Sequence, residues 1–354
     1  MNVNKYLPKS AIFALLISLF VGISLLLSAN FAGFADAVNS SVCRLFRGAI
    51  SRISALLPFS LTELLLILSP IILVLVFRLA LRSTASRTSR IRFAVSAAAI
   101  LSLFFSAYAL TLGFSYRASP IAEKMSLTLS DGHSQSELEA ALSVLAKRVG
   151  REAEEVGDFD YQNATSAIMD SYLDFYEEYP IIDSYTPPPK RLLFSELPSR
   201  LGVLGLYFPY TAEVNINTRQ PSYMISFSIA HELAHAKGIA KEDEANFLAF
   251  VICSTSSDPF VRYSGYLSAF EIVASALYRC DADAYFSILK SLPERAIFDL
   301  RSSSDFLSLS NNSFADAGGT ANDAHLKASG TAGAVSYNLA LELIVSYCGY
   351  LSSS

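Results

Sequence analysis

The stretch His231-Glu-Leu-Ala-His235, with Glu242-Asp-Glu-Ala-Asn246 close behind it, decides the fold expected for the second half of the chain. Residues four apart lie on the same face of an α-helix, so the imidazoles of His231 and His235 can reach one metal ion. The run 222–230 before them is apolar with helical spacing. The pattern therefore predicts a buried helix that carries two metal ligands.

Glu232 adds another functional group to this helix. In the register that brings the two histidines together, its carboxylate lies next to the position of a metal-bound water, where it can act as a general base. The chain has only four histidines, and the other two are His133 and His325, so finding two of the four in this register argues against coincidence. We therefore expect a Zn²⁺ site with His231 and His235 as ligands and Glu232 as the catalytic residue.

A third protein ligand is expected shortly after the histidines. Gly238 should end the first helix in the left-handed conformation, which lets the chain reverse and return an acidic segment to the metal. In that segment Glu242 is the leading candidate and Glu244 is the alternative. The stretch Glu242-x-x-Ala245-Asn246 is similar to the Glu-x-x-Ala-Asp/Asn helix of metallopeptidases whose third ligand is a glutamate. Asn246, one turn on, could hydrogen-bond the ring nitrogen of a ligand histidine that does not bind zinc.

The composition indicates a membrane protein with one further domain. Of 354 residues, 52% are hydrophobic and 17% are charged, and the mean hydropathy is +0.38, which is too apolar for an ordinary soluble protein. Three apolar runs predict transmembrane helices at about 11–29, 60–81 and 93–116. We therefore expect a membrane domain at residues 1–116 and a metallopeptidase-like domain at residues 117–354.

The two parts differ in charge, and the difference predicts an orientation. Residues 1–116 hold ten basic residues against Asp36 and Glu63, and because the whole chain has 27 basic and 32 acidic residues, 17 and 30 remain for the rest. The basic cluster at 82–92 should be cytoplasmic by the positive-inside rule, so three spans place the domain after about Tyr116 outside. Since that domain is acidic and has no basic stripe, we expect no nucleic-acid partner.

The segment between the first two spans, residues 31–59, mixes apolar residues with Arg44, Arg47 and Arg52. These arginines oppose the orientation weakly. Their amphipathic pattern suits a helix at the membrane surface, and contact with lipid headgroups would account for their charge.

The four cysteines are Cys43, Cys253, Cys280 and Cys348. They are too few and too scattered for a disulfide framework. We expect buried free thiols, and a pairing of Cys253 with Cys280 or Cys348 is the alternative.

The domain after the spans is expected to be mainly helical. Helical patterns cover about 137–156, with Ser134 or Ser136 as the cap, and also 164–179, 258–276, 283–292 and 337–350. We expect the last of these to belong to the core rather than to form a fourth span. The Ser/Gly/Asn-rich stretch 302–320 is expected to be a compositional break.

One strand is expected just ahead of the metal helix. Residues 211–218 alternate apolar and polar side chains, which is typical of a half-buried strand. Many zinc peptidases keep at this place the edge strand that pairs with an extended substrate. An ordinary half-buried strand is the alternative.

Several of these motifs together resemble a bacterial membrane family described as domain of unknown function family 3810. The resemblance covers nearly the whole chain. That family has no established activity, so the resemblance implies a metal site and a bacterial cytoplasmic membrane but no substrate. The motifs are the three spans, Tyr210-Thr-Ala-Glu213-Val-Asn215, the segment 231–247, Arg262-Tyr263-Ser264-Gly265-Tyr266, Leu326-Lys327-x-x-Gly330 and Ser336-Tyr337.

The metal helix also resembles that of the gluzincins, in which two histidines and a glutamate hold zinc. Six residues separate His235 from Glu242, which departs from the usual gluzincin spacing. The spacing is closer to that of metzincin-like sites. In those sites the third ligand would be at position 241, which is a lysine here and cannot be a ligand. The third ligand is therefore left open between Glu242 and Glu244.

These features predict a membrane-anchored zinc metallopeptidase with a zincin-like outer domain and a peptide or protein substrate. A phenol from Tyr263, Tyr266 or Tyr337 could stabilise the oxyanion of the reaction. The alternative is a non-enzymatic membrane protein with a structural zinc site. Structural sites close with four protein ligands and are usually rich in cysteine, and no cysteine lies near His231 in the sequence, which favours the catalytic interpretation.

Overall fold

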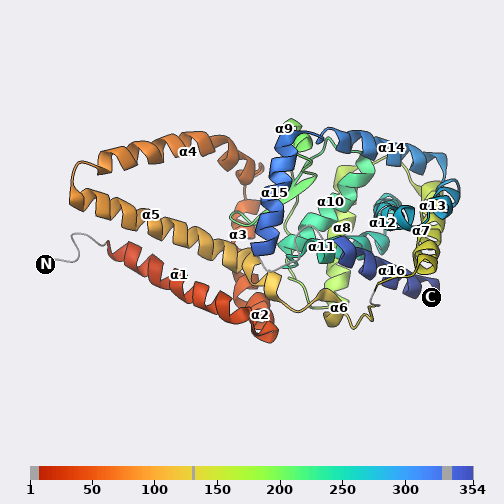
Figure 1. Cartoon of the computed structure of the whole chain (residues 1–354), viewed down its shortest axis with the longest axis horizontal. Coiled ribbons are helices and arrows are strands. Elements are labelled where there is room, and N and C mark those ends of the chain that lie inside the picture. Colours follow the sequence, from red (N-terminus) through yellow and green to blue (C-terminus); the bar gives the residue numbers. More distant parts are fainter. Residues whose placement is uncertain (1–7, 130–131, 329–336, 354) are drawn as a thin grey trace. The chain divides into compact units, whose positions relative to one another are not determined.

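The computed structural model describes residues 8–129, 132–328 and 337–353, and it is mainly helical, as predicted (Figure 1). The chain forms two compact units. Unit 1 comprises Met1–Ala118 and Phe208–Glu213, and unit 2 comprises Ser119–Tyr207 and Val214–Ser354. The change of unit at residue 118 lies close to the boundary expected at residue 116. The short segment Phe208–Glu213, by contrast, was expected in the second domain and groups with unit 1.

Among the described residues, unit 1 contains three helices that are long and apolar enough to cross a membrane, and they lie at the three places where spans were predicted. They are α1 (Lys9–Ser28), α4 (Leu61–Ser83) and α5 (Arg87–Tyr108), which continues into a π-helical turn, η3 (Ala109–Gly113). In Figure 1, α5 lies between α1 and α4. It packs against α1 through small side chains, Ala99 facing Ala11 and Ala14.

The last span begins at Arg87 rather than at about residue 93. Ser86 explains the early start, because its side chain accepts a hydrogen bond from the N–H of Ser89 at 3.1 Å and so caps the first turn. Most of the basic cluster at 82–92 therefore lies on the ends of α4 and α5 rather than in the connection between them.

The connection between the first two spans is helical. It consists of α2 (Ala32–Val38), a π-helical turn η2 (Asn39–Cys43) and α3 (Arg44–Ala55), and a 3₁₀ turn, η4 (Ser115–Arg117), follows the last span. The prediction that Arg47 contacts lipid headgroups was wrong, because this side chain is only 2% exposed. Its guanidinium donates to Asn39 Oδ1 at 2.7 Å and to the carbonyl of Thr111 at 3.2 Å. Polar groups inside unit 1 thus supply the acceptors that this arginine needs.

Segment Phe208–Glu213 joins unit 1 through a helix cap. The buried carboxylate of Glu213 accepts hydrogen bonds from the backbone N–H of Leu61 at 3.1 Å and from the N–H and hydroxyl of Thr62, both at 2.7 Å. The first N–H groups of a helix have no partner within the helix, and a negative charge there is favoured by the helix dipole. Glu213 therefore fixes the start of α4 from a distant place in the chain.

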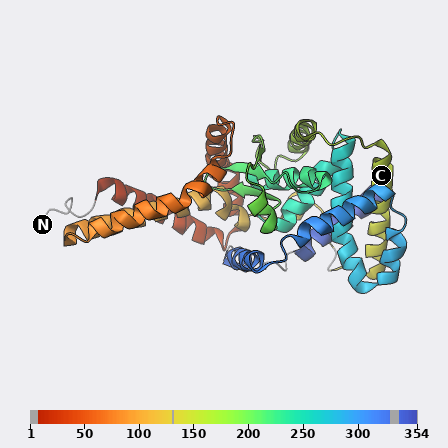
Figure 2. The ribbon, with the colours of Figure 1, turned by 90° about the horizontal axis from the view of Figure 1, so that it is seen from above.

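Unit 2 is built from helices around a buried pair, α10 and α11. The helices α7 and α12 of this unit lie side by side in both views (Figure 1, Figure 2), and α12 also contacts α10 and α11. The helices are α6 (Ile121–Lys124), α7 (Gln135–Glu155), α8 (Tyr161–Glu178), α9 (Glu196–Arg200), α10 (Ser222–Ala236), α11 (Glu242–Ser254), α12 (Pro259–Cys280), α13 (Ala282–Leu289), α14 (Glu294–Ser308), α15 (Ser313–Ala328) and α16 (Tyr337–Ser353).

Most helix predictions for this unit are confirmed. Ser134 caps α7 in a capping box with Glu137. The last helix, α16, belongs to the core, since Leu343 and Ile344 are almost fully buried. None of the four cysteines is in a disulfide, and three are buried, as expected, whereas Cys280 is exposed.

The compositional break at 302–320 does not prevent helix formation, because α14 and α15 cover most of this stretch. Serine hydroxyls here bond to the preceding helical turn. Ser302 Oγ donates to the carbonyl of Phe298 at 2.9 Å, and Ser308 Oγ donates to that of Asp305 at 2.7 Å. Serine can be accommodated in a helix in this way, so composition alone was a poor guide.

The sheet has three strands in the order β1-β3-β2. They are β1 (Lys190–Arg191), β2 (Gly205–Phe208) and β3 (Glu213–Ile216), and β1 runs parallel to β3. The strand predicted at 211–218 is present as β3, but it is not the edge strand, because it lies between β1 and β2, and it is not half-buried either. Asn215 and Asn217 are 0% exposed, because their amides donate to the carbonyls of Leu206 at 3.2 Å and Val203 at 2.9 Å.

Candidate metal centre

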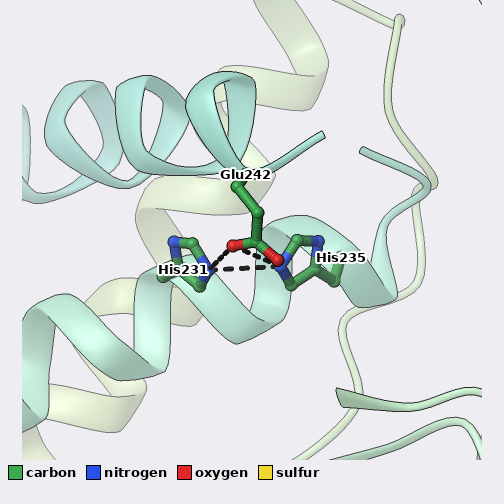
Figure 3. Close-up of side chains that lie close together, drawn as sticks. All are labelled: His231, His235 and Glu242. Atoms are coloured by element: carbon green, nitrogen blue, oxygen red, sulfur yellow. Dashed lines mark hydrogen bonds and ion pairs between the residues drawn. The ribbon is translucent and has the colours of Figure 1, made fainter. Parts of the chain in front are cut away.

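The turn between α10 and α11 brings the predicted ligands together. Gly238 has φ of +92°, and the N–H of Ile239 bonds to the carbonyl of Ala234 at 3.0 Å. This is the left-handed helix end that the glycine predicted. The chain then reverses, and α11 begins at Glu242, directly above the face of α10 that carries His231 and His235 (Figure 3).

Three potential ligand atoms converge at this point. His231 Nε2 and His235 Nε2 are 3.1 Å apart, and Glu242 Oε2 lies 3.2 Å from the first and 3.7 Å from the second. Two ligands at the usual distance of about 2.0–2.1 Å from a tetrahedral Zn²⁺ lie about 3.3 Å from each other. The spacing of the three atoms therefore fits one zinc ion among them.

A second hydrogen bond sets the tautomer of His235. Its Nδ1 lies 2.8 Å from the carbonyl oxygen of Ile239, which can only accept, so Nδ1 carries a proton. In the neutral ring, Nε2 then presents a lone pair to the cluster, as a metal ligand requires. The same helix end that reverses the chain thus orients one ligand. The sequence predicted the reversal but not this contact.

Electrostatics in the cluster favours an added positive charge. Burial acts to lower the pKa of His235, but the carboxylates of Glu242 and Glu232 outweigh it and raise that pKa to about 9. Burial acts to raise the pKa of Glu242, but the two histidines outweigh it and hold that pKa well below its usual range. In the metal-free protein the cluster therefore holds a proton, and a bound cation would take its place.

The two candidate third ligands have different surroundings. Glu242 faces the histidines, whereas Glu244 Oε1 accepts hydrogen bonds from the N–H of Ile121 and from Lys241 Nζ, both at 3.2 Å. Burial raises the pKa of Glu244. Lys241, the residue at the metzincin-like spacing, is likewise engaged in this ion pair. The structure therefore brings Glu242, and not Glu244, to the cluster.

The carboxylate of Glu232 is held beneath strand β2. Its Oε2 accepts a hydrogen bond from the N–H of Tyr207 at 2.6 Å. Gly205 makes this approach possible, because a Cβ there would lie 2.6 Å from Glu232 Cγ. Burial raises the pKa of Glu232, against the effect of both histidines. Gly205 and Tyr207 were not predicted as site residues from the sequence, although a glycine inside a strand is a known sign of close approach.

The other predicted site residues lie elsewhere. Asn246 makes no hydrogen bond to a histidine among the described residues, and His231 Nδ1 is buried without a partner. The expected Asn246–histidine contact is thus not formed. The hydroxyl of Tyr263 donates to Asp299 Oδ2 at 2.7 Å, and Tyr266 packs on the ring of Phe250.

The hydroxyl of Tyr263 is therefore already engaged by Asp299, whereas the role of Tyr266 as an oxyanion stabiliser stays a prediction. The side chain of the third candidate, Tyr337, lies outside the described residues, as do Gly330 and Ser336 of the late motif.

Lys237, two residues after His235, has a structural role. Its side chain is buried, and Nζ donates to the carbonyl of Asp183 at 2.7 Å. The N–H of Asp183 in turn bonds to the carbonyl of Lys237 at 3.0 Å. This pair of bonds ties the end of the metal helix to the loop that follows α8.

The cluster is open to solvent on one side. The side chains of His231 and Glu242 are 15% and 31% exposed. Among the described residues, the cluster contains three ligand groups and no cysteine. A structural zinc site closes with four protein ligands, whereas a catalytic one leaves a position for water or substrate. The arrangement is therefore that of an open site.

Fold and site together describe a mainly helical protein with three helices that are long and apolar enough to cross a membrane and with a partly exposed His-Glu cluster beside strand β2. The family model described as "Protein of unknown function (DUF3810)" matches residues 39–345, and the chain belongs to this family. No curated protein and no solved structure matches the chain.

Proposed function

We propose that this protein is a membrane-anchored, zinc-dependent metallopeptidase that hydrolyses peptide bonds at the outer face of the bacterial cytoplasmic membrane. The observation that carries the proposal is the convergence of His231 Nε2, His235 Nε2 and Glu242 Oε2 within one zinc coordination sphere, beside the buried carboxylate of Glu232.

Glu232 is the group that would move the proton. Zinc, when bound by the three ligands, supplies a Lewis acid that acidifies water and polarises a carbonyl. Glu232 would accept the proton of the attacking water and pass it to the leaving amine. Burial raises the pKa of this carboxyl, which brings its proton affinity closer to that needed near neutral pH. The N–H of Tyr207 fixes its orientation.

The position of strand β2 favours a peptide as the substrate. Strand β2 is an end strand in the sheet order β1-β3-β2, and the N–H of Tyr207 on it points to Glu232 rather than to β3. The outer edge of β2 therefore runs beside the proposed general base. An extended peptide that paired with this edge would place one of its carbonyl groups near Glu232.

The open side of the cluster favours catalysis over the alternative, a structural zinc site. Three ligand groups with partly exposed His231 and Glu242 leave room for water and substrate. A structural role would predict that zinc stabilises the fold and that no Glu232 variant changes any activity.

The proposed location of unit 2 outside the cytoplasm is argued from the positive charge at the ends of α4 and α5. Arg82, Arg87, Arg90 and Arg92 lie on the adjoining ends of α4 and α5, and such clusters stay in the cytoplasm. Digestion of unit 2 by a protease added to intact cells would agree with the proposal. Protection in intact cells with digestion only after lysis would contradict it.

The sharpest test of the function is Glu232→Gln. Glutamine retains the shape of the side chain but cannot accept a proton, so hydrolysis should fall by roughly a hundred- to ten-thousand-fold, while zinc content stays at the level of the unchanged protein. Full-length protein in detergent would be incubated with a peptide library, and products would be identified by mass spectrometry.

Glu244→Gln is the matched control, because it makes the same chemical change on the neighbouring helix. It should keep both zinc and activity. Cleavage that survives Glu232→Gln undiminished would contradict the mechanism, and absence of zinc from the unchanged protein would contradict the metal site.

A further inference from the structure

An exposed apolar surface stands out on unit 2, between β1 and the end of α9. Leu193, Phe194 and Leu197 are 77%, 65% and 64% exposed. We call these three residues the apolar patch. Single exposed hydrophobic residues are common on proteins, but three large ones within five positions form a contiguous surface of the kind that contacts a partner or a membrane.

The fold holds the apolar patch outward by anchoring the backbone on both sides of it. Before the patch, the N–H of Leu192 bonds to the carbonyl of Ile216 on β3 at 2.9 Å. Within it, Ser195 Oγ donates to the carbonyl of Leu192 at 3.0 Å. After it, the buried Ser199 accepts a bond from the amide of Asn217 at 3.0 Å. The exposure therefore follows from the hydrogen bonding of the segment.

The charge around the apolar patch is opposite to that of the rest of the domain. Residues 117–354 carry 17 basic and 30 acidic groups. Residues 190–219, in contrast, carry four basic residues against two acids, Glu196 and Glu213, and Glu213 is buried under α4. The four basic residues are Lys190, Arg191, Arg200 and Arg219.

Apolar side chains flanked by cations suit one partner in particular, the surface of a lipid bilayer. Phosphate groups attract the cations, and the apolar side chains enter the acyl region just below them. Arg200 and Arg219 both pair with Glu196, which orders the charged rim beside Leu197.

The chain itself keeps a bilayer within reach of the apolar patch. The last candidate span ends at Gly113 and unit 2 begins at Ser119, so covalent geometry alone keeps the start of unit 2 within about 20 Å of that span's end. The patch is also bonded to β3, which leaves unit 1 at Glu213, three residues before Ile216.

We propose that the apolar patch inserts into the bilayer surface on the side of the membrane where unit 2 lies. Leu193, Phe194 and Leu197 enter the upper acyl region, and the neighbouring arginines lie at the level of the phosphates. Unit 2 then has a membrane contact of its own in addition to the three spans. This contact requires neither zinc nor peptidase activity.

The chain offers a clean probe for this contact, because it contains no tryptophan. Phe194→Trp in the full-length protein would be reconstituted into vesicles whose lipids carry bromine at a shallow acyl position. Its fluorescence should shift to the blue and lose at least roughly half its intensity relative to vesicles without bromine, as expected for a side chain 5–10 Å deep in the interface.

Phe298→Trp is the matched control, since Phe298 is also a phenylalanine of unit 2 and is 69% exposed on α14. It should remain unquenched. If Phe194→Trp does not fold, Leu197→Trp tests the same patch. Equal quenching at residues 194 and 298 would overturn the proposal, because the domain would then adhere without using the patch.

Absence of quenching at residue 194 would also overturn the proposal. A blue-shifted but unquenched emission would mean that protein, either unit 1 or a second copy of the chain, covers the patch. An unshifted emission would mean that water covers it.

Discussion

In most proteins polar side chains are exposed and apolar side chains are buried. The helix pair α10–α11 and the apolar patch depart from this rule in opposite ways. The helix pair buries polar groups, with Glu232 and His235 in the interior of unit 2. The patch exposes Leu193, Phe194 and Leu197. Buried charges and exposed apolar surface both cost free energy in an isolated protein, and a ligand or a membrane can offset each cost.

The difference lies in what each region needs from outside. The helix pair already offers three converging ligand atoms and lacks only a compact positive charge. The patch has a fixed backbone and presents apolar side chains at the surface. The first region therefore points to a metal ion, and the second points to lipid.

The largest effect should come from the ligands in the helix pair. Glu242→Gln should lower zinc affinity by more than the roughly 10- to 100-fold that loss of an outer hydrogen-bonding partner costs. The reason is that the neutral amide leaves two neutral imidazoles to hold a dication. Zinc bound to purified protein, titrated against a chelator, measures this loss.

Glu244→Gln makes the same substitution two residues away, where Lys241 and Ile121 are the partners. It should leave zinc affinity unchanged. The opposite result, with zinc lost only in Glu244→Gln, would transfer the ligand role to Glu244 and break the contrast between the two carboxylates.

Replacing a phenylalanine by alanine should lower the free energy of unfolding much more in the core than in the apolar patch. Phe250 on α11 is fully buried, so Phe250→Ala should cost about 3–5 kcal/mol. Phe194→Ala, at an exposed position, should change stability in detergent by less than about 0.5 kcal/mol. Thermal unfolding followed by circular dichroism compares the two. A large loss from Phe194→Ala would show that its ring packs against protein, contrary to the lipid proposal.

The smallest effect should be a pH dependence of zinc binding. His235, with its pKa raised to about 9 in the metal-free protein, must lose its Nε2 proton to become a ligand. Zinc affinity should therefore rise with pH up to about 9, and binding at pH 7 should release about one proton from this group. Glu242 adds none, because its lowered pKa leaves it already ionised.

Calorimetry in two buffers of different ionisation enthalpy would measure this proton release. His235→Ala should abolish it together with zinc binding. Binding without proton release would mean that His235 is neutral in the metal-free protein.

Much of the architecture could be predicted because it depends on local patterns. Apolar runs predicted the three spans, and the serine cap and the glycine helix end were correct at Ser134 and Gly238. Errors arose where a side chain found a partner far along the chain. Arg47 is buried by Asn39 and Thr111, and the amide of Asn215 donates to the carbonyl of Leu206 on strand β2.

The sequence by itself determined which chemistry the site can offer, because His231 and His235 share a helix face and Glu232 directly follows the first of them. Only the tertiary structure decided between Glu242 and Glu244, placed Gly205 and Tyr207 over Glu232, and exposed the apolar patch. The physical reason is the distance along the chain over which each kind of interaction acts. Helix periodicity acts over a few residues, whereas these contacts depend on how α11, β2 and β3 pack, which no local pattern specifies.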